Sequence, residues 1–342
     1  EKAMALIDHA YKNGVNYFDT AMPYTDGKNE SFLGKALKRY PRESFYLATK
    51  LSLPFLDKKE DADDLINRQL DALQTNYIDM YLLHAMNKEN FKIVKEWGLL
   101  DILKRWKKEG KIRYIGFSFH DDYATFKHIL DYYDWDFCQI QLNYLDTDIQ
   151  QGLRGYYDLE ARKIPVVVME PVKGGKLAGF KKPIEKIFTD YSDASIASWA
   201  LRWVGSLPGV KVILSGMNEM EQVTDNINIF KSFRPLDVEE KLRVEAVKKA
   251  LLSVKAVGCT HCKYCLPCTV GIDIPMLFNI LNSYRMFEDV EEAKYYYDFL
   301  RKNTQPPTSC IECGKCVKLC PQHINIPEEL KKVTSEMPFI DF

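Results

Sequence analysis

The first 235 or so residues of the chain alternate between helix-like stretches and short apolar runs. Apolar residues recur at helical spacing near residues 4–11, 66–73, 99–106 and 196–203. Seven apolar runs have the length of strands, namely VNYFD, FYLATK, IDMYLLH, IRYIGFS, FCQIQLN, PVVVME and VKVILSG. This alternation predicts an α/β fold in which parallel strands are joined by helical crossovers, as in a TIM (β/α)8-type barrel.

Seven strands are one fewer than a closed (β/α)8 barrel needs. The sequence begins directly in a helical stretch, with no strand ahead of it. We therefore expect the first strand of the barrel to be absent from this chain. The alternative is an open barrel, which would leave two unpaired sheet edges.

Three of the predicted strands end in an ionisable residue. VNYFD ends in Asp19, FYLATK in Lys50 and IDMYLLH in His84. Because the carboxyl ends of parallel barrel strands all reach one face, these three side chains should converge there. Tyr24 follows Asp19 by five residues, in the loop TAMPYTDG, and we expect it on the same face.

Together, these four residue types suit proton donation to a carbonyl oxygen. A tyrosine with a pKa near ~10 is a poor acid at neutral pH, but a neighbouring ammonium lowers such a pKa and a carboxylate can hold the ammonium in place. Tyr24 would donate the proton as hydride reaches the carbonyl carbon, and His84 would orient the oxygen. Each residue also has an alternative role when it is considered singly. Asp19 could cap a turn, Lys50 could be a surface charge and His84 could be a hydrogen-bonded histidine of the core.

These motifs resemble those of the aldo/keto reductase family. GVNYFDTAMPY is similar to the family's Asp-Thr-Ala…Tyr motif, YLATK to its lysine strand and YLLH to its histidine strand. The resemblance continues through IRYIGFSFH, QIQLNY and GVKVILSGMNEMEQVTDNI and covers roughly residues 1–235. It places Asp19, Tyr24, Lys50 and His84 on the family's catalytic tetrad. It implies an oxidoreductase that uses NADP or NAD to reduce a small carbonyl substrate, or to oxidise the alcohol.

The resemblance also implies residues that contact the dinucleotide. Those near the nicotinamide are Ser118, Gln139 and Asn143, with Met169, Glu170 and Pro171 at the position where many relatives place an aromatic ring. Those of the phosphate loop are Ser215, Gly216 and Met217, and those on the adenine side are Gln222, Asp225 and Asn226. Independently, loops after the last two strands of such barrels commonly hold phosphate.

Two features of these loops bear on the cofactor. No Lys or Arg occurs from Ser215 to Phe230, whereas Glu219 and Glu221 do. A 2′-phosphate favours a cation, so the sequence does not select NADP over NAD. The segment KGGK at 173–176 lacks the spacing of a P-loop, and we expect a turn that closes over the pyrophosphate.

Eight of the nine cysteines fall in two runs near the end of the chain. The second run, C-x2-C-x2-C-x3-C-P, has the spacing of two-cluster ferredoxins, in which the fourth cysteine reaches the other cluster. In the first run the last gap is two residues, and Thr269 stands in place of proline. The spacing predicts two 4Fe-4S clusters, one held by Cys259, Cys262, Cys265 and Cys320, and the other by Cys310, Cys313, Cys316 and Cys268.

Disulfides and zinc are the alternatives for these cysteines. Disulfides would suit a small secreted domain, but the sequence shows no signal peptide. Zinc would use paired knuckles with His261 and His323 as spare ligands, yet it does not require four evenly spaced cysteines twice. Cys138 is predicted to be a small buried apolar residue rather than a ligand. The cysteine tail resembles that of an aldo/keto reductase subgroup with a ferredoxin-like domain at its C-terminus.

We therefore expect two domains with a connector, as about 150 residues per domain suggests for 342 residues. They are a barrel over 1–236, a connecting helix over 237–257 and a small, mainly helical, ferredoxin-like domain over 258–342. Within the last, a Tyr- and Phe-rich helix is predicted over 278–301. The formal net charge of −1 gives no basic field for nucleic acid, and no apolar run is long enough for a membrane. Reduced cysteines without a targeting signal point to the cytoplasm.

The clusters leave more than one function open. They would exchange electrons with a one-electron carrier such as ferredoxin, or serve only to hold the tail together. Hydride carries two electrons while a cluster accepts one, and no separate flavin domain is evident in the sequence. A redox sensor that binds NAD(P) without turnover is the alternative to the reductase, and a ferredoxin-type carrier with a vestigial barrel is a third function.

Overall fold

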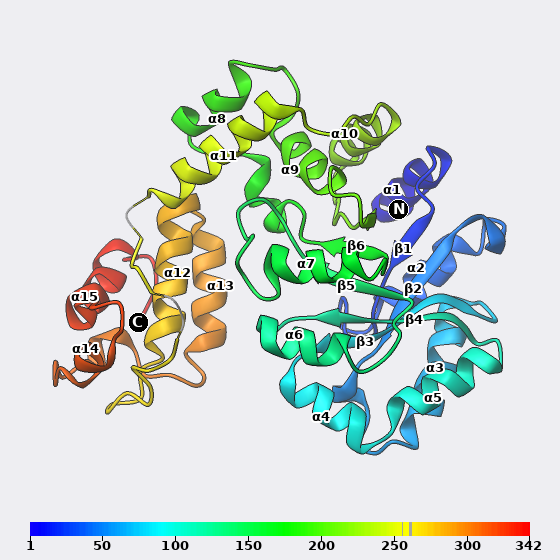
Figure 1. Cartoon of the computed structure of the whole chain (residues 1–342), viewed down its shortest axis with the longest axis horizontal. Coiled ribbons are helices and arrows are strands. Elements are labelled where there is room, and N and C mark those ends of the chain that lie inside the picture. The colour runs from blue at the N-terminus through cyan, green and yellow to red at the C-terminus, as the bar shows by residue number, and fades with distance from the viewer. Residues whose placement is uncertain (255, 260–261) are drawn as a thin grey trace. The chain divides into compact units, whose positions relative to one another are not determined.

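The computed structural model describes residues 1–254, 256–259 and 262–342. The chain divides into two compact units (Figure 1). The first unit consists of Glu1–Gly179 and Asp193–Lys241, and the second of Phe180–Ser192 and Leu242–Phe342. Within the described residues, no helix has both the length and the apolar character needed to cross a membrane.

The first unit is built on one seven-stranded parallel sheet whose strands follow one another in sequence order. The strands are β1 (Tyr17–Asp19), β2 (Tyr46–Leu51), β3 (Ile78–Met86), β4 (Ile112–Phe119), β5 (Phe137–Gln141), β6 (Val166–Met169) and β7 (Val210–Ile213). All seven predicted strands, and the TIM-type α/β architecture, are thereby confirmed. In the described sheet, β1 pairs only with β2 and β7 only with β6, so the sheet is curved but not closed.

Helices lie outside the sheet (Figure 1). They are α1 (Lys2–Lys12), α2 (Asn29–Leu37), α3 (Asp61–Leu73), α4 (Lys88–Glu96), α5 (Leu99–Lys108), α6 (Tyr123–Leu130), α7 (Gly152–Ala161), α9 (Ile196–Gly205) and α10 (Met220–Lys231). Helix α1 precedes β1, α10 follows β7, and the others connect successive strands. Helix α5 shows why they form: Leu99, Leu103 and Trp106 recur at helical spacing and are fully buried, while its lysines face solvent. The same pattern confirms the helices expected near residues 4–11, 66–73 and 196–203.

Alternation along the strands builds two layers inside the curved sheet, because residues i and i+2 of a strand face the same side. The lower layer is a buried apolar cluster of Ala48, Leu82, Phe137 and Val167. Two residues further along the same strands come Lys50, His84, Gln139 and Met169. The apolar layer therefore forms a floor beneath a layer of mostly polar side chains.

Gly116 is required by this floor. A Cβ atom at Gly116 on β4 would lie 2.6 Å from Cε1 of Phe137, closer than real Cβ contacts come. The Phe137 ring therefore occupies the space that any larger residue at Gly116 would need. Ser118, two residues later on β4, rises above the ring into the polar layer.

The second unit is helical. Its elements are α8 (Lys182–Thr189), most of α11 (Val238–Leu252), α12 (Ile274–Phe287), α13 (Val290–Leu300), α14 (Lys315–Leu319) and α15 (Ile326–Glu336). Helix α12 packs against both α13 and α15, and the core between them contains Leu277, Phe278 and Leu330. Three cysteines from each run pack against this core, namely Cys259, Cys265, Cys268, Cys310, Cys316 and Cys320.

The prediction of one helix over 278–301 is wrong. Two helices occupy this range, because Glu288 adopts a left-handed conformation with φ of 55° that ends α12. The side chain of Asp289 then accepts a hydrogen bond from the backbone N–H of Glu292 and caps the start of α13.

Candidate functional site

Asp19 and Lys50 form an ion pair at the carboxyl ends of β1 and β2. The Lys50 ammonium lies 2.7 Å from Oδ1 of Asp19 and donates a second hydrogen bond, of 2.8 Å, to the carbonyl oxygen of Thr20. The side chain of Lys50 is 1% exposed and that of Asp19 is 12% exposed. Burial raises the pKa of Asp19, and the positive charge of Lys50 opposes that shift. The pair therefore fixes the Lys50 ammonium in one position below the surface of this face.

Tyr24 and His84 lie beside this pair. The Lys50 ammonium is 5.0 Å from the centre of the Tyr24 ring, and the rings of Tyr24 and His84 meet edge to face at 6.0 Å. Tyr24 is 38% exposed, whereas Lys50 beneath it is buried. The four residues expected to converge thus lie in one group, with Tyr24 on its open side.

His84 is held neutral by its surroundings. Burial, together with the charges of Lys50 and His120, lowers the pKa of His84 to about 3. His120 follows β4 directly, and burial lowers its pKa as well. Sequence reasoning missed His120, although IRYIGFSFH places it at a strand end on the same face as His84.

A buried network of polar side chains supports the backbone of Lys50. This network was not predicted from the sequence. Glu30, on α2, accepts hydrogen bonds from Thr49 Oγ1 at 2.5 Å and from Gln69 Nε2 at 2.9 Å. Gln69 also donates to the carbonyl oxygen of Lys50. Burial raises the pKa of Glu30, and the bonds from Thr49 and Gln69 act in the other direction. This network fixes the backbone of β2 where Lys50 leaves it.

Of the residues expected near a nicotinamide, Gln139 is the one whose buried hydrogen-bonding atom lacks a partner among the described residues. Gln139 is 1% exposed, and its Oε1 is buried without a partner in the described part of the chain. Such an acceptor fits the amide N–H groups of a nicotinamide. Ser118 instead accepts the backbone N–H of Ala85 at 2.8 Å.

Asn143 is engaged within the protein. Its Nδ2 donates to Asp146 and to the carbonyl oxygen of Glu170, and its Oδ1 accepts two backbone N–H groups. Asp146 also accepts from Lys173 Nζ at 2.6 Å. Asn143 therefore organises the loop after β5 and ties it to the segment after β6.

Met169, Glu170 and Pro171 form the end of β6 and the turn beyond it. Glu170 has a φ of 55°, and burial raises its pKa. The segment KGGK follows as a short 3-10 element over Lys173–Ala178, with Gly174 and Gly175 at φ of 64° and 97°. These two positions favour glycine because left-handed backbone is strained for other residues. The Lys173–Asp146 ion pair anchors the start of this turn.

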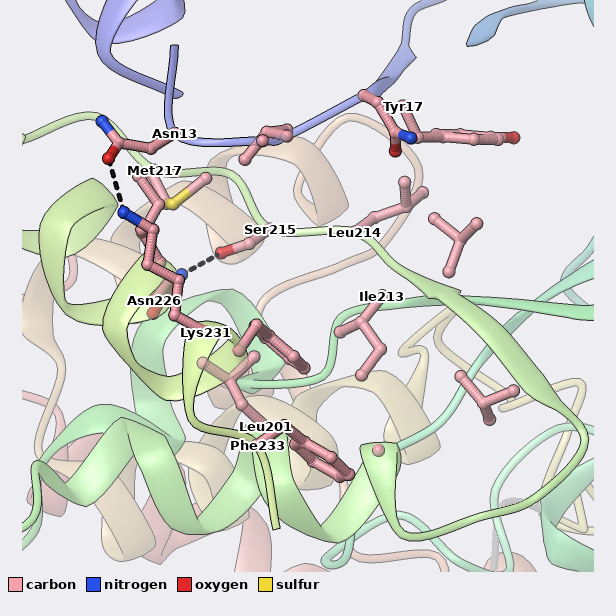
Figure 2. A pocket seen from close by; sticks show the side chains of 18 of the residues that line it. Asn13, Tyr17, Leu201, Ile213, Leu214, Ser215, Met217, Asn226, Lys231 and Phe233 are labelled. Atoms are coloured by element: carbon pink, nitrogen blue, oxygen red, sulfur yellow. Dashed lines mark hydrogen bonds between the residues drawn. The ribbon is translucent and has the colours of Figure 1, made fainter. Parts of the chain in front are cut away.

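A cavity of about 750 Å³ lies between the β1 and β7 sides of the open sheet (Figure 2). The expected phosphate-loop residues Ser215, Gly216 and Met217 line it, as does Asn226. Asn226 donates a hydrogen bond of 2.9 Å to Ser215 Oγ, which joins the loop after β7 to α10.

The other two adenine-side candidates, Gln222 and Asp225, both lie on α10. Gln222 accepts the backbone N–H groups of Asn218 and Glu219 in a capping box, and Asp225 accepts the hydroxyl of Ser195. The N-cap residue itself is Glu219, which pairs with Lys2 at 2.5 Å. A carboxylate therefore already occupies this helix N-terminus.

The eight cysteines of the two runs, all of them in the second unit, surround two small cavities. Cys259, Cys262, Cys265 and Cys320 line one of them, and Cys268, Cys310, Cys313 and Cys316 line the other. In each set, three thiols come from one run and the fourth from the other run. Ile274 lines both cavities and so stands between the sets. The grouping fits the ligand sets expected for two clusters.

Each set has one exposed cysteine, Cys262 in the first and Cys313 in the second. The backbone N–H of Lys315 and the hydroxyl of Thr269 lower the pKa of the Cys313 thiol, which favours a thiolate there. Among the described residues, no three His, Cys, Asp or Glu side chains are arranged to hold a single metal ion. His261, one of the spare zinc ligands considered above, lies outside the described residues.

Cys138 stands apart from both sets. It is fully buried in β5 within the apolar core of the first unit, as predicted.

Comparison with known families gives two matches. The profile of the aldo/keto reductase family matches residues 1–249, and that of the 4Fe-4S dicluster domain matches residues 258–324. The two matched ranges follow one another along the chain without overlap.

Individual relatives match over most of the first range. An uncharacterized oxidoreductase of Bacillus subtilis is 26% identical over 70% of this chain and 86% of its own length. An NADH-specific methylglyoxal reductase of Escherichia coli is 25% identical over 65% of this chain and 80% of its own length. The holo form of an aldo-keto reductase from Bacillus halodurans superposes with a TM-score of 0.61 at 25% identity, over 72% of this chain and 88% of that one. An aldo-keto reductase from Klebsiella pneumoniae in complex with NADPH superposes with a TM-score of 0.61 at 22% identity, over 72% and 84%, and this likeness concerns the fold.

Proposed function

Because this chain belongs to the aldo/keto reductase family and carries a C-terminal 4Fe-4S domain, we propose that it reduces a small carbonyl compound with NAD(P)H, with Tyr24 as the proton donor. The observation that carries this proposal is the buried ion pair of Lys50 and Asp19, with the ring of Tyr24 lying 5.0 Å from the ammonium. A buried cation next to an accessible tyrosine stabilises the phenolate that forms when the tyrosine gives up its proton.

When bound, the dinucleotide supplies hydride to the carbonyl carbon. Tyr24 transfers its hydroxyl proton to the carbonyl oxygen, and the positive charge of Lys50 stabilises the phenolate that remains. Asp19 holds Lys50 in place. His84, neutral at physiological pH, donates a hydrogen bond to the same oxygen and orients it.

The residues around the polar layer and the loop after β7 would bind the dinucleotide. The open acceptor of Gln139 supports a contact to the nicotinamide amide, and Ser215 to Met217 are proposed for the phosphates. Since Glu219 caps α10 and pairs with Lys2, and no Lys or Arg occurs from Ser215 to Phe230, a 2′-phosphate at this helix would have to compete with the Glu219 carboxylate for Lys2. We therefore expect NADH to bind more tightly than NADPH.

The two sets of cysteines would hold two 4Fe-4S clusters. The four cysteines that line one cavity would be the ligands of one cluster. Each cluster would approach solvent at its exposed cysteine, Cys262 or Cys313. Exposed lysines in the same segments are Lys263, Lys315 and Lys318. Glu312 of the same segment is already paired with Lys331, so the three lysines would be available to receive an acidic one-electron carrier such as ferredoxin. The cytoplasm is the compartment we propose, because it keeps the cysteines reduced.

A steady-state assay of the anaerobically prepared protein tests the function. We expect oxidation of NADH, and more weakly of NADPH, with at least one compound in a panel of aldehydes, ketones and hydroxy-carbonyls. Tight dinucleotide binding without turnover of any carbonyl or alcohol would instead identify a redox sensor. Cluster reduction by a reduced ferredoxin, monitored by electron paramagnetic resonance, tests the partner separately.

A further inference from the structure

Ser52 lies where the chain leaves β2, two residues after Lys50. Its hydroxyl oxygen is 2.6 Å from Nδ1 of His84 on the neighbouring strand, and Ser52 is only 2% exposed. In the described part of the chain, Oγ of Ser52 has His84 as its single hydrogen-bond partner. Ser52 and His84 thus form a hydrogen-bonded pair in the polar layer of the candidate active site, above the apolar floor.

This bond determines which nitrogen of His84 carries the proton. The burial and the nearby positive charge of Lys50 keep the imidazole neutral. A neutral imidazole has one N–H donor and one bare nitrogen that accepts. The partner of one nitrogen therefore sets the state of the other.

The two possible arrangements differ in how well they satisfy Ser52. If Nδ1 carried the proton and donated it to Ser52, the serine O–H would be buried with no acceptor, which is unfavourable. If Ser52 donates to Nδ1, both groups are satisfied and the proton is on Nε2. The second arrangement leaves no buried donor unpaired.

Nε2 is the ring nitrogen remote from Ser52, and the His84 ring meets the Tyr24 ring edge to face at 6.0 Å. We propose that Ser52 is a positioning residue that holds His84 as the Nε2–H tautomer, so that His84 donates a hydrogen bond to the substrate oxygen beside Tyr24. The role of this donor in turnover rests on the proposed function, whereas the tautomer itself does not.

Nuclear magnetic resonance of the full chain labelled with ¹⁵N-histidine measures the tautomer directly. Two-bond ¹H–¹⁵N couplings distinguish the two tautomers, and a His84→Gln variant assigns the signals. At pH 7, we expect His84 to be Nε2–H in the wild-type protein and to populate the Nδ1–H form in Ser52→Ala. In the carbonyl assay, Ser52→Ala should lower kcat between about 10- and 100-fold with little change in the KM of the dinucleotide. Ser52→Thr, which keeps the hydroxyl, should restore both the tautomer and most of kcat.

Ser198→Ala is the matched control. Ser198 is also buried and its hydroxyl also donates a hydrogen bond, at 2.6 Å to the carbonyl oxygen of Ser195, so this variant should leave the His84 signals unchanged. An Nδ1–H tautomer in the wild-type protein would overturn the proposal, and so would an unchanged tautomer in Ser52→Ala. If Ser52→Ala does not fold, Ser52→Thr takes its place, and an Nδ1–H tautomer in the wild-type protein still overturns the proposal. Full activity in Tyr24→Phe would count against the proposed function but leave the tautomer result standing.

Discussion

The guanidinium of Arg202 makes two hydrogen bonds to the carboxylate of Glu240, at 2.8 and 2.6 Å, and joins α9 to the first turn of α11. The two side chains are 9% and 1% exposed. Arg234 donates to the same carboxylate, as does the backbone N–H of Asp237. Removing one partner of a buried, bidentate ion pair of this kind strongly lowers the free energy of unfolding.

The Glu240 pair makes the stability of the first unit depend on pH. Burial alone would raise the pKa of Glu240, but the hydrogen bonds from Arg202, Asp237 and Arg234 outweigh it and lower the pKa to about 2. A carboxyl whose folded pKa is lowered stabilises the fold above its unfolded pKa of about 4.3, and this stabilisation is lost as pH falls toward 2. We expect Glu240→Gln to lower the free energy of unfolding by about 3 kcal/mol at pH 7, and the difference from wild type to shrink below pH 4.

Tryptophan fluorescence during urea unfolding measures this effect, because all five tryptophans lie in the first unit. Asp101→Asn is the control, since the Lys104–Asp101 pair is exposed and should contribute less than about 1 kcal/mol. A difference between wild type and Glu240→Gln that stays constant from pH 7 to pH 3 would contradict the assigned shift.

Lys50→Met should both destabilise the barrel and abolish carbonyl reduction. It leaves the buried carboxylate of Asp19 without its partner, which costs about 3–5 kcal/mol in the free energy of unfolding. The double variant Lys50→Met with Asp19→Asn removes both charges and should recover much of that stability, but not activity. Equal instability of the single and double variants would show that the two charges are not coupled.

Tyr24→Phe should lower kcat for carbonyl reduction by at least ~10²-fold, because the ring stays while its proton is removed. Dinucleotide affinity, measured by fluorescence titration, should change little. Tyr46→Phe is the control, since Tyr46 is also exposed but lies at the start of β2, at the opposite end of the strand from Lys50. Turnover near that of the wild-type protein would remove Tyr24 from the mechanism.

Cys320→Ala should remove one cluster selectively. Cys320 lines the cavity of Cys259, Cys262 and Cys265, so its loss should lower bound iron from about eight to about four per chain. Cys138→Ala, which removes the buried thiol of β5, should leave iron and sulfide unchanged. Iron counts of zero in Cys320→Ala would indicate that the two sets assemble together, and zinc without sulfide in the wild-type protein would rule out clusters altogether.

The strands and most helices of the barrel could be predicted because their signals are local. Alternating apolar residues and strand-end ionisable residues are visible in runs such as IDMYLLH. The break between α12 and α13 was missed, because the residue that adopts the left-handed conformation there is Glu288 rather than a glycine or asparagine. A Tyr- and Phe-rich stretch with no glycine or proline carries no stop signal that periodicity can detect.

The residues that support the candidate site were harder to find than the group itself. Ser52, Glu30 and Gln69 act through contacts between different strands and helices, and their sequence neighbours do not mark them. A period-two rule applied from Lys50 would have placed Ser52 on the same face of the sheet as Lys50 itself. From the sequence, Glu30 would be assigned to the exposed side of an amphipathic helix, because its partners Thr49 and Gln69 are distant in sequence.

The mixed composition of the two cysteine sets has a consequence for how the protein is made. During synthesis, Cys259, Cys262 and Cys265 emerge from the ribosome well before Cys320, which completes their set. The first three thiols therefore wait, reduced and only partly enclosed, until about 55 more residues have been translated. If the set holds a cluster as proposed, that cluster can be completed only after Cys320 has been made, and a chain cut short before Cys320 would carry three thiols without their fourth partner.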